Sequence, residues 1–199
     1  MHIWKIAGCV LLLAVPGLTA CGRDPSPAGH THPAGKRRTP DAADARRFTQ
    51  AFYDWYVPLD TGLQRPTWAT VGAHRPHPFS PELLRALKDD EQAQDKDPGY
   101  IVGLDFDPVV ASQDPCERYV VGDAVRSGSG YRVNVHSVCQ GKRSSTPDVV
   151  VELVPHAASW SIVNLHYPQF HGDLIEILRQ LAKDRSRPVA PAQDSAPAS

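Results

Sequence analysis

Apolar residues recur at steps of three and four in three parts of the chain, which predicts three amphipathic helices. The first helix is predicted from about residue 40 to residue 57, with Thr39 as its cap, and its apolar stripe is Ala45, Phe48, Phe52 and Trp55. The second is predicted to begin at Ser80-Pro81-Glu82, where a capping serine precedes a proline and an acid. The proline-rich segment 61–79 between them is predicted to be a long ordered loop.

After residue 99 the pattern changes to a period of two, which is typical of strands with one buried face. Four strands are predicted, at 117–126, 130–140, 147–155 and 159–167, and the first two flank the turn sequence Ser127-Gly128-Ser129. Asp173 is expected to cap a last helix. Since consecutive strands require an antiparallel sheet, the predicted fold class is α+β, with helices packed on one face of a four-stranded sheet.

The N-terminal residues have the pattern of an export signal. The apolar run 6–15 follows the basic Lys5 and ends at Pro16-Gly17; it is too short to span a bilayer, which takes about 20 residues. Leu18-Thr19-Ala20-Cys21 resembles the lipobox of bacterial lipoproteins, in which the cysteine is lipidated and becomes the new N-terminus. An ordinary signal peptide with an incidental cysteine is the alternative. The resemblance implies an acylated Cys21, and Gly22 in place of aspartate favours the outer membrane, with the protein facing the periplasm.

Four regions follow from this pattern. We expect a leader at 1–20, the lipidated Cys21 with a flexible linker at 21–40, one domain at 41–182 and a disordered tail at 183–199. The linker and tail are rich in small polar residues, proline and glycine, which bury too little surface to offset chain entropy. The whole chain has a formal net charge of -1, whereas residues 41–182 hold 13 basic and 19 acidic side chains. This balance argues against nucleic acid as a partner.

Two cysteines remain once Cys9 leaves with the leader and Cys21 is lipidated. If Ser127-Gly128 forms the turn, Cys116 and Cys139 face each other across the hairpin; if Gly128-Ser129 forms it, they are diagonal neighbours on one sheet face. Both registers predict a disulfide in an oxidising compartment. Two buried free thiols are the alternative.

Three carboxylates lie close together in the segment 104–115, namely Asp105, Asp107 and Asp114. We interpret them as turn-forming residues that bond nearby backbone N–H groups. Oxygen ligands also suit Ca²⁺, and two close carboxylates suit acid–base catalysis, so a metal site and a catalytic site are the alternatives.

A second acidic run, Asp89-Asp90-Glu91, is either the solvated end of a helix or a binding patch for a basic partner. The nine histidines do not have the spacing of a metal site. The sequence has no nucleophile elbow, phosphate loop or zincin motif. We therefore expect no metal, no cofactor, no catalytic residue and no enzymatic activity.

Four pieces of the sequence together resemble a family of small, mostly uncharacterised bacterial envelope proteins, often lipoproteins. They are Phe52-Tyr53-Asp54-Trp55-Tyr56, the segment 104–114 with its Asp-Phe-Asp-Pro and Gln-Asp, Trp160-Ser161-Ile162, and the closing helix. The resemblance covers residues 41–182 and implies a cone like that of nuclear transport factor 2, in which helices pack into a curved antiparallel sheet. The segment 61–79 is longer than the family pattern, and the family has no accepted catalytic residues to carry over.

The resemblance also implies a function. Some members look like immunity proteins paired with secreted antibacterial toxins, and others look like accessories of envelope transport complexes. We therefore expect a lipid-anchored, periplasm-facing protein that neutralises a secreted toxin by direct binding. The first alternative is an accessory subunit of an outer-membrane transport or efflux complex. The second is a small-molecule carrier or enzyme that uses the cone interior, with Asp105, Asp107 and His136 around its pocket.

Overall fold

The computed structural model describes residues 40–60, 66–74 and 77–187. They form an α+β fold, which confirms the predicted class. The predicted leader, the lipidation site Cys21, nearly all of the linker, and the tail from residue 188 lie outside the described residues. In chain order the elements are α1 (Ala42–Tyr56), the 3-10 turn η1 (Val57–Leu59), α2 (Trp68–Ala73), α3 (Pro81–Lys96), β1 (Arg118–Ser127), β2 (Gly130–Cys139), β3 (Lys142–Arg143), β4 (Val149–His156), β5 (Ser159–Tyr167), β6 (Gly172–Asp173) and α4 (Leu174–Arg185).

Six strands of the described residues form one antiparallel sheet. Its order is β1-β2-β4-β5-β6, and β3 pairs with β2 beside this path. The four long strands are those predicted from the sequence, whereas the two-residue strands β3 and β6 are additional. The sheet does not close on itself, since β1 and β6 end the path.

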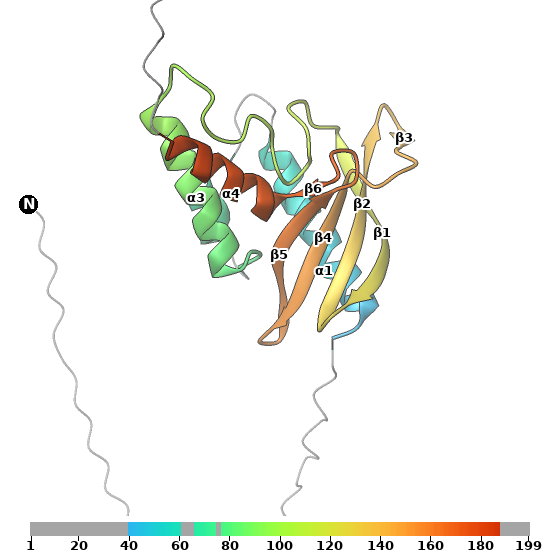
Figure 1. The fold of residues 1–199 in the computed structure, drawn as a ribbon. Coiled ribbons are helices and arrows are strands. Elements are labelled where there is room, and N and C mark those ends of the chain that lie inside the picture. Colours follow the sequence, from blue (N-terminus) through green and yellow to red (C-terminus); the bar gives the residue numbers. More distant parts are fainter. Residues whose placement is uncertain (1–39, 61–65, 75–76, 188–199) are drawn as a thin grey trace, which may run out of the picture. The chain divides into compact units, whose positions relative to one another are not determined.

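The helices lie in two places around this sheet. Figure 1 shows α1 along one face, whereas α3 and α4 pack against each other and against the β5 side. Strand residues facing α1, such as Val133, Val135 and Val151, are fully buried. Their neighbours Arg132 and Glu152 point to the opposite face and are at least partly exposed. The predicted packing of helices on one face therefore describes α1, and on the opposite face the part around Arg132 and Glu152 is open to solvent.

The caps of the long helices are aspartate and serine side chains. Asp41, rather than the predicted Thr39, caps α1: its carboxylate accepts from the Asp44 N–H at 2.9 Å, and Asp44 accepts from the Asp41 N–H at 3.1 Å. This reciprocal pair satisfies two N–H groups that a helix start leaves open. Ser80 and Asp173 cap α3 and α4, as predicted.

Two parts of the chain differ from the prediction. The segment 61–79 contains the short helix α2, whose N-terminus is capped by the Thr67 side chain, so the description of this segment as a loop was wrong for that part. The last helix continues to Arg185, beyond the predicted domain boundary at 182. No helix in the described part of the chain is long and apolar enough to cross a membrane.

The hairpin between β1 and β2 turns at Gly128-Ser129, the second of the two predicted registers. Ser127 pairs with Gly130, and Gly128 has a φ of +54°, a left-handed conformation that glycine adopts without steric cost. Between Val121 and Ala124 the strand β1 carries a bulge that shifts the register for the rest of the hairpin.

A disulfide joins Cys116, just before β1, to Cys139 at the end of β2, which confirms the prediction. The two Cα atoms are 4.9 Å apart. The bond therefore ties together the open end of the hairpin, opposite the turn.

The outer edge of β1 is covered by a side chain from α1. Gln50 Oε1 accepts the Val121 N–H at 2.9 Å, and Gln50 Nε2 donates to the Tyr119 carbonyl at 3.1 Å. The amide thus takes the place of a neighbouring strand, which protects an edge that would otherwise pair with another chain.

Candidate functional site

The segment 97–117, between α3 and β1, is held down by three tyrosine hydroxyls. Two come from α1 and one from β5, and all three rings are almost fully buried. Burial raises the pKa of Tyr53 and of Tyr167 well above the ordinary value, so both remain neutral hydrogen-bond donors. The bonds run from Tyr53 to the Val109 carbonyl (2.7 Å), from Tyr56 to the Asp107 carboxylate (2.7 Å) and from Tyr167 to the Pro108 carbonyl (3.0 Å). The sequence pieces 52–56 and 104–114, which both carry the family resemblance, are therefore in direct contact.

Asp107 is the buried carboxylate of this segment, with only 1% of its surface exposed. Its Oδ1 accepts the Val109 N–H at 2.7 Å, and its own N–H donates to the Ser112 carbonyl at 2.9 Å. Burial, together with a hydrogen bond and the charge of Asp60, raises the pKa of Asp107 to about 7, although the Tyr56 hydroxyl and the Val109 N–H lower it. The carboxyl of Asp107 is therefore partly protonated near neutral pH.

The other two carboxylates of the segment lie elsewhere. Asp105 and Asp114 are exposed. The buried neighbour of Asp107 is instead Asp60 at the end of η1, which was not predicted because no local signal links residues so far apart. A carboxylate this deeply buried and bonded to its own loop organises that loop, and a substrate has no direct access to it.

The acidic run of α3 divides into different roles. Asp90 is buried and forms an ion pair with Arg185 of α4 at 2.6 Å. Its second oxygen accepts the Leu104 N–H at 2.8 Å, and Arg185 also donates to the Val102 carbonyl at 2.7 Å. Asp90 therefore joins α3, α4 and the segment after α3, which is a structural role rather than that of a surface patch.

The neighbours of Asp90 are more accessible. Asp89 is exposed, whereas Glu91 is partly buried and accepts the Trp68 N–H of α2 at 3.2 Å. Of the three residues in the run, Asp89 is thus the one whose carboxylate is available to a partner.

Residues 97–103, which we name the Tyr-Ile loop, expose two large apolar side chains. Tyr100 is 73% and Ile101 is 76% exposed. The backbone beneath them is fixed by the amide of Gln94, which donates to the Tyr100 carbonyl at 2.7 Å and accepts the N–H groups of Val102 (3.0 Å) and Gly103 (3.1 Å). The loop therefore presents an apolar pair on an ordered backbone.

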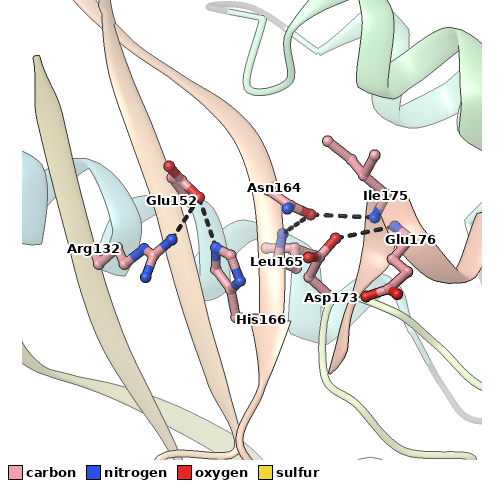
Figure 2. Close-up of polar contacts among 8 residues, drawn as sticks. All are labelled: Arg132, Glu152, Asn164, Leu165, His166, Asp173, Ile175 and Glu176. Carbon is pink, nitrogen blue, oxygen red and sulfur yellow. Dashed lines mark hydrogen bonds and ion pairs between the residues drawn. The ribbon is translucent and has the colours of Figure 1, made fainter. Parts of the chain in front are cut away.

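The open face of the sheet carries a row of polar side chains from three adjacent strands. Figure 2 shows Glu152 of β4 between Arg132 of β2, at 3.5 Å, and His166 of β5, at 2.6 Å. Beside this row, the Asn164 amide oxygen accepts the Ile175 N–H at 3.2 Å, which fixes the start of α4 on β5. Partly exposed ion pairs of this kind contribute little to stability.

His136 of β2, predicted to lie around a pocket with Asp105 and Asp107, is buried. Its Nδ1 lies 3.1 Å from the Ser144 carbonyl oxygen, so the ring anchors the chain that follows β3. Among the residues that the structure describes, no three His, Cys, Asp or Glu side chains are grouped so that they could hold a metal ion.

Comparisons with known proteins do not assign the chain to a family. No protein-family model matches it, no curated protein is significantly similar to it, and no solved structure matches its fold.

Proposed function

We propose that the protein is a lipid-anchored, non-enzymatic binding protein of the bacterial envelope that recognises a basic protein partner through the Tyr-Ile loop. The observation that carries the proposal is the exposed pair of Tyr100 and Ile101 on a backbone fixed by Gln94. Single exposed apolar residues are ordinary, but a tyrosine and an isoleucine side by side offer the kind of anchor on which interfaces depend. Because the loop is already ordered, binding loses little conformational entropy.

The charge around the loop favours a basic partner. Asp95 and Asp97 are exposed at the end of α3, and Asp89 is exposed earlier on the same helix. The predicted domain as a whole has more acidic than basic side chains, 19 against 13. An acidic surface accelerates the approach of a basic protein and disfavours an acidic one.

The disulfide supports a location outside the cytosol, because such bonds persist in oxidising compartments. Combined with the leader and the lipobox-like Cys21, it supports our proposal of an outer-membrane lipoprotein that faces the periplasm. We further propose that the fold is the nuclear transport factor 2-like cone and that the protein belongs to the envelope family, because helix α1 on an antiparallel sheet is compatible with that cone. For a protein held there, the partner we propose is a secreted antibacterial toxin, which makes the protein an immunity protein.

A growth competition tests this function. A strain that lacks the gene is grown in contact with its wild-type parent, and we expect the parent to kill it. The wild-type gene should restore survival, and a Tyr100→Ala, Ile101→Ser double variant present at equal level should not. Val125→Ser is the matched control, because Val125 is 62% exposed on β1 and its loss removes apolar surface elsewhere. Equal survival of the deletion strain and its parent would contradict an immunity role.

Photo-crosslinking separates this role from that of an accessory subunit. A crosslinking amino acid is placed at position 101 or, as the control, at position 125, and adducts are identified by mass spectrometry. A secreted toxin joined at 101 and not at 125 supports the proposal. A resident envelope channel joined at 101 in cells that meet no toxin would instead establish the accessory role.

A further inference from the structure

A cavity of about 510 Å³, open to solvent on one side, lies between the first half of α3 and the turn that joins β4 to β5. Its apolar wall consists of Phe79, Pro81 and Leu84. This volume falls within the range of about 300–1,000 Å³ that is typical of small-molecule sites. The proposed protein-binding loop does not contribute to this cavity, whereas Ser161 belongs to the sequence piece Trp160-Ser161-Ile162 and Pro81 to the capping sequence of α3.

The wall of the cavity is built on a fixed backbone. The Ser80 N–H donates to the Ile162 carbonyl at 2.8 Å, and the Ile162 N–H donates to the Pro78 carbonyl at 2.8 Å, so residues 78–80 pair with β5 in parallel. The Phe79 ring contacts Phe52 edge to face, with ring centroids 5.5 Å apart. The cavity is therefore formed before any ligand arrives.

Polar groups around the cavity are basic or neutral. Arg85 and Lys88 line it from α3, and neither forms an ion pair within the described part of the chain. The hydroxyl of Ser161, a residue only 5% exposed, also lines it and makes no hydrogen bond to another described residue. The imidazoles of His77 and His156 complete the rim, and none of the lining residues is acidic. Arg85 and Lys88 thus have no carboxylate partner in the described part of the chain, although the domain as a whole is acidic.

We propose that this cavity binds a long-chain fatty acid, with the acyl chain against Phe79, Pro81 and Leu84 and the carboxylate at Arg85 and Lys88. An apolar cavity with a cationic rim is complementary to a molecule with one apolar tail and one anionic head. A peptide fits less well, because the β5 edge at Ile162 is already paired with residues 78–80 and offers no free strand edge to extend.

The binding test uses the mature chain, residues 21–199, with Cys21→Ser, purified without detergent and with the Cys116–Cys139 disulfide intact. Palmitate is titrated below its micelle concentration and followed by calorimetry and native mass spectrometry. We expect one palmitate per chain, and weaker binding of octanoate because its shorter tail buries less apolar surface. Hexadecyltrimethylammonium, which has a similar tail and a cationic head, should bind at least about tenfold more weakly. Equal binding of the two head groups would overturn the proposal.

Charge variants test the site itself. An Arg85→Gln, Lys88→Gln double variant should lose about tenfold or more in palmitate affinity. The matched control is Lys142→Gln, Arg143→Gln, which removes the same charge from the exposed strand β3. Equal affinities of the two double variants would overturn the assignment, and a circular-dichroism melt confirms that both are folded. Tighter binding of palmitoyl lysophosphatidate than of palmitate would replace the carboxylate head with a phosphate and overturn the fatty acid as ligand.

Discussion

At the scale of single residues, buried carboxyl groups organise the segment that precedes the sheet. Asp107 has one oxygen bonded to the Tyr56 hydroxyl and the other to the Val109 N–H, close to the second buried carboxyl of Asp60. Because the pKa of Asp107 is raised from 3.8 to about 7, the folded protein holds this proton more tightly than the unfolded chain does.

The raised pKa predicts a pH dependence of stability. The contribution of Asp107 to the free energy of unfolding is full below about pH 4, falls as the pH rises to about 7, and changes no further above that. Asp107→Asn has no titrating carboxyl, so its stability does not fall in this way. Between about pH 4 and 7 the free energy of unfolding of the variant should therefore rise relative to that of the wild type, by an amount on the order of 4 kcal/mol. Urea unfolding at pH 4 and pH 8 measures this difference, with the exposed Asp105→Asn as control. The same pH slope in wild type and Asp107→Asn would contradict it.

The burial of Asp90 predicts that its removal destabilises the fold more than removal of its neighbour Asp89. Asp90→Ala leaves the partly buried Arg185 without its ion pair and the Leu104 N–H without its acceptor. Its loss should lower the free energy of unfolding by about 3 kcal/mol, whereas Asp89→Ala should change it by less than about 0.5 kcal/mol. Urea denaturation of the two variants compares them directly. A loss of similar size in both would mean that the Asp90–Arg185 pair does not stabilise the fold.

Sequence alone does not reveal the partner of Asp90. Asp90 follows Leu83 and Leu87 at helical spacing, so the period of α3 places it on the buried face and Asp89 off that face, whereas its ion pair with Arg185, 95 residues away, has no local signal. The same holds for Asp107, whose pairing with Asp60 and Tyr56 depends on how α1 lies against the segment 97–117. Long-range side-chain partners of this kind leave no periodic signal.

At the scale of elements, local patterns predict more. The four long strands, the β1–β2 turn and the caps Ser80 and Asp173 follow from alternation and turn chemistry within a few residues. The helix α2 was missed because the prolines around it suggest a loop, while its cap Thr67 depends on a single side chain. The bulge at Val121 was missed because apolar residues on both faces of β1, such as Val120, Val121 and Val125, conceal the change of phase that an extra residue causes.

Gln50 yields a prediction at this scale, because it bonds one element to the edge of another. Gln50→Ala removes the acceptor of the Val121 N–H and the donor to the Tyr119 carbonyl. We expect a loss of about 1–2 kcal/mol in the free energy of unfolding and faster amide exchange along β1. Gln92→Ala, at an exposed position of α3, is the matched control. Unchanged exchange in β1 peptides by mass spectrometry would contradict the role of Gln50 in covering the edge.

At the scale of the whole domain, α3 separates the two proposed binding regions. The cavity lies at its first half, around Arg85, and the Tyr-Ile loop follows its last residue, Lys96. A helix of 16 residues spans about 24 Å, so a ligand in the cavity and a partner on the loop need not compete. The fatty-acid proposal and the immunity proposal can therefore fail independently, and variants at one region serve as controls for the other.

The cavity and the Tyr-Ile loop can meet ligands of the envelope only if the chain is anchored there. This anchoring leads to a prediction for the complete protein. Cys21→Ser removes the proposed acylation site, so the protein should move from the membrane fraction to the soluble fraction. A Cys116→Ser, Cys139→Ser double variant is the control: it should remain in the membrane fraction and lose about 3 kcal/mol of stability with its disulfide. Immunoblots of separated fractions measure the distribution, and mass spectrometry confirms removal of the leader. If the Cys21→Ser protein, with its leader removed, still sediments with membranes, a contact other than the lipid holds the domain there.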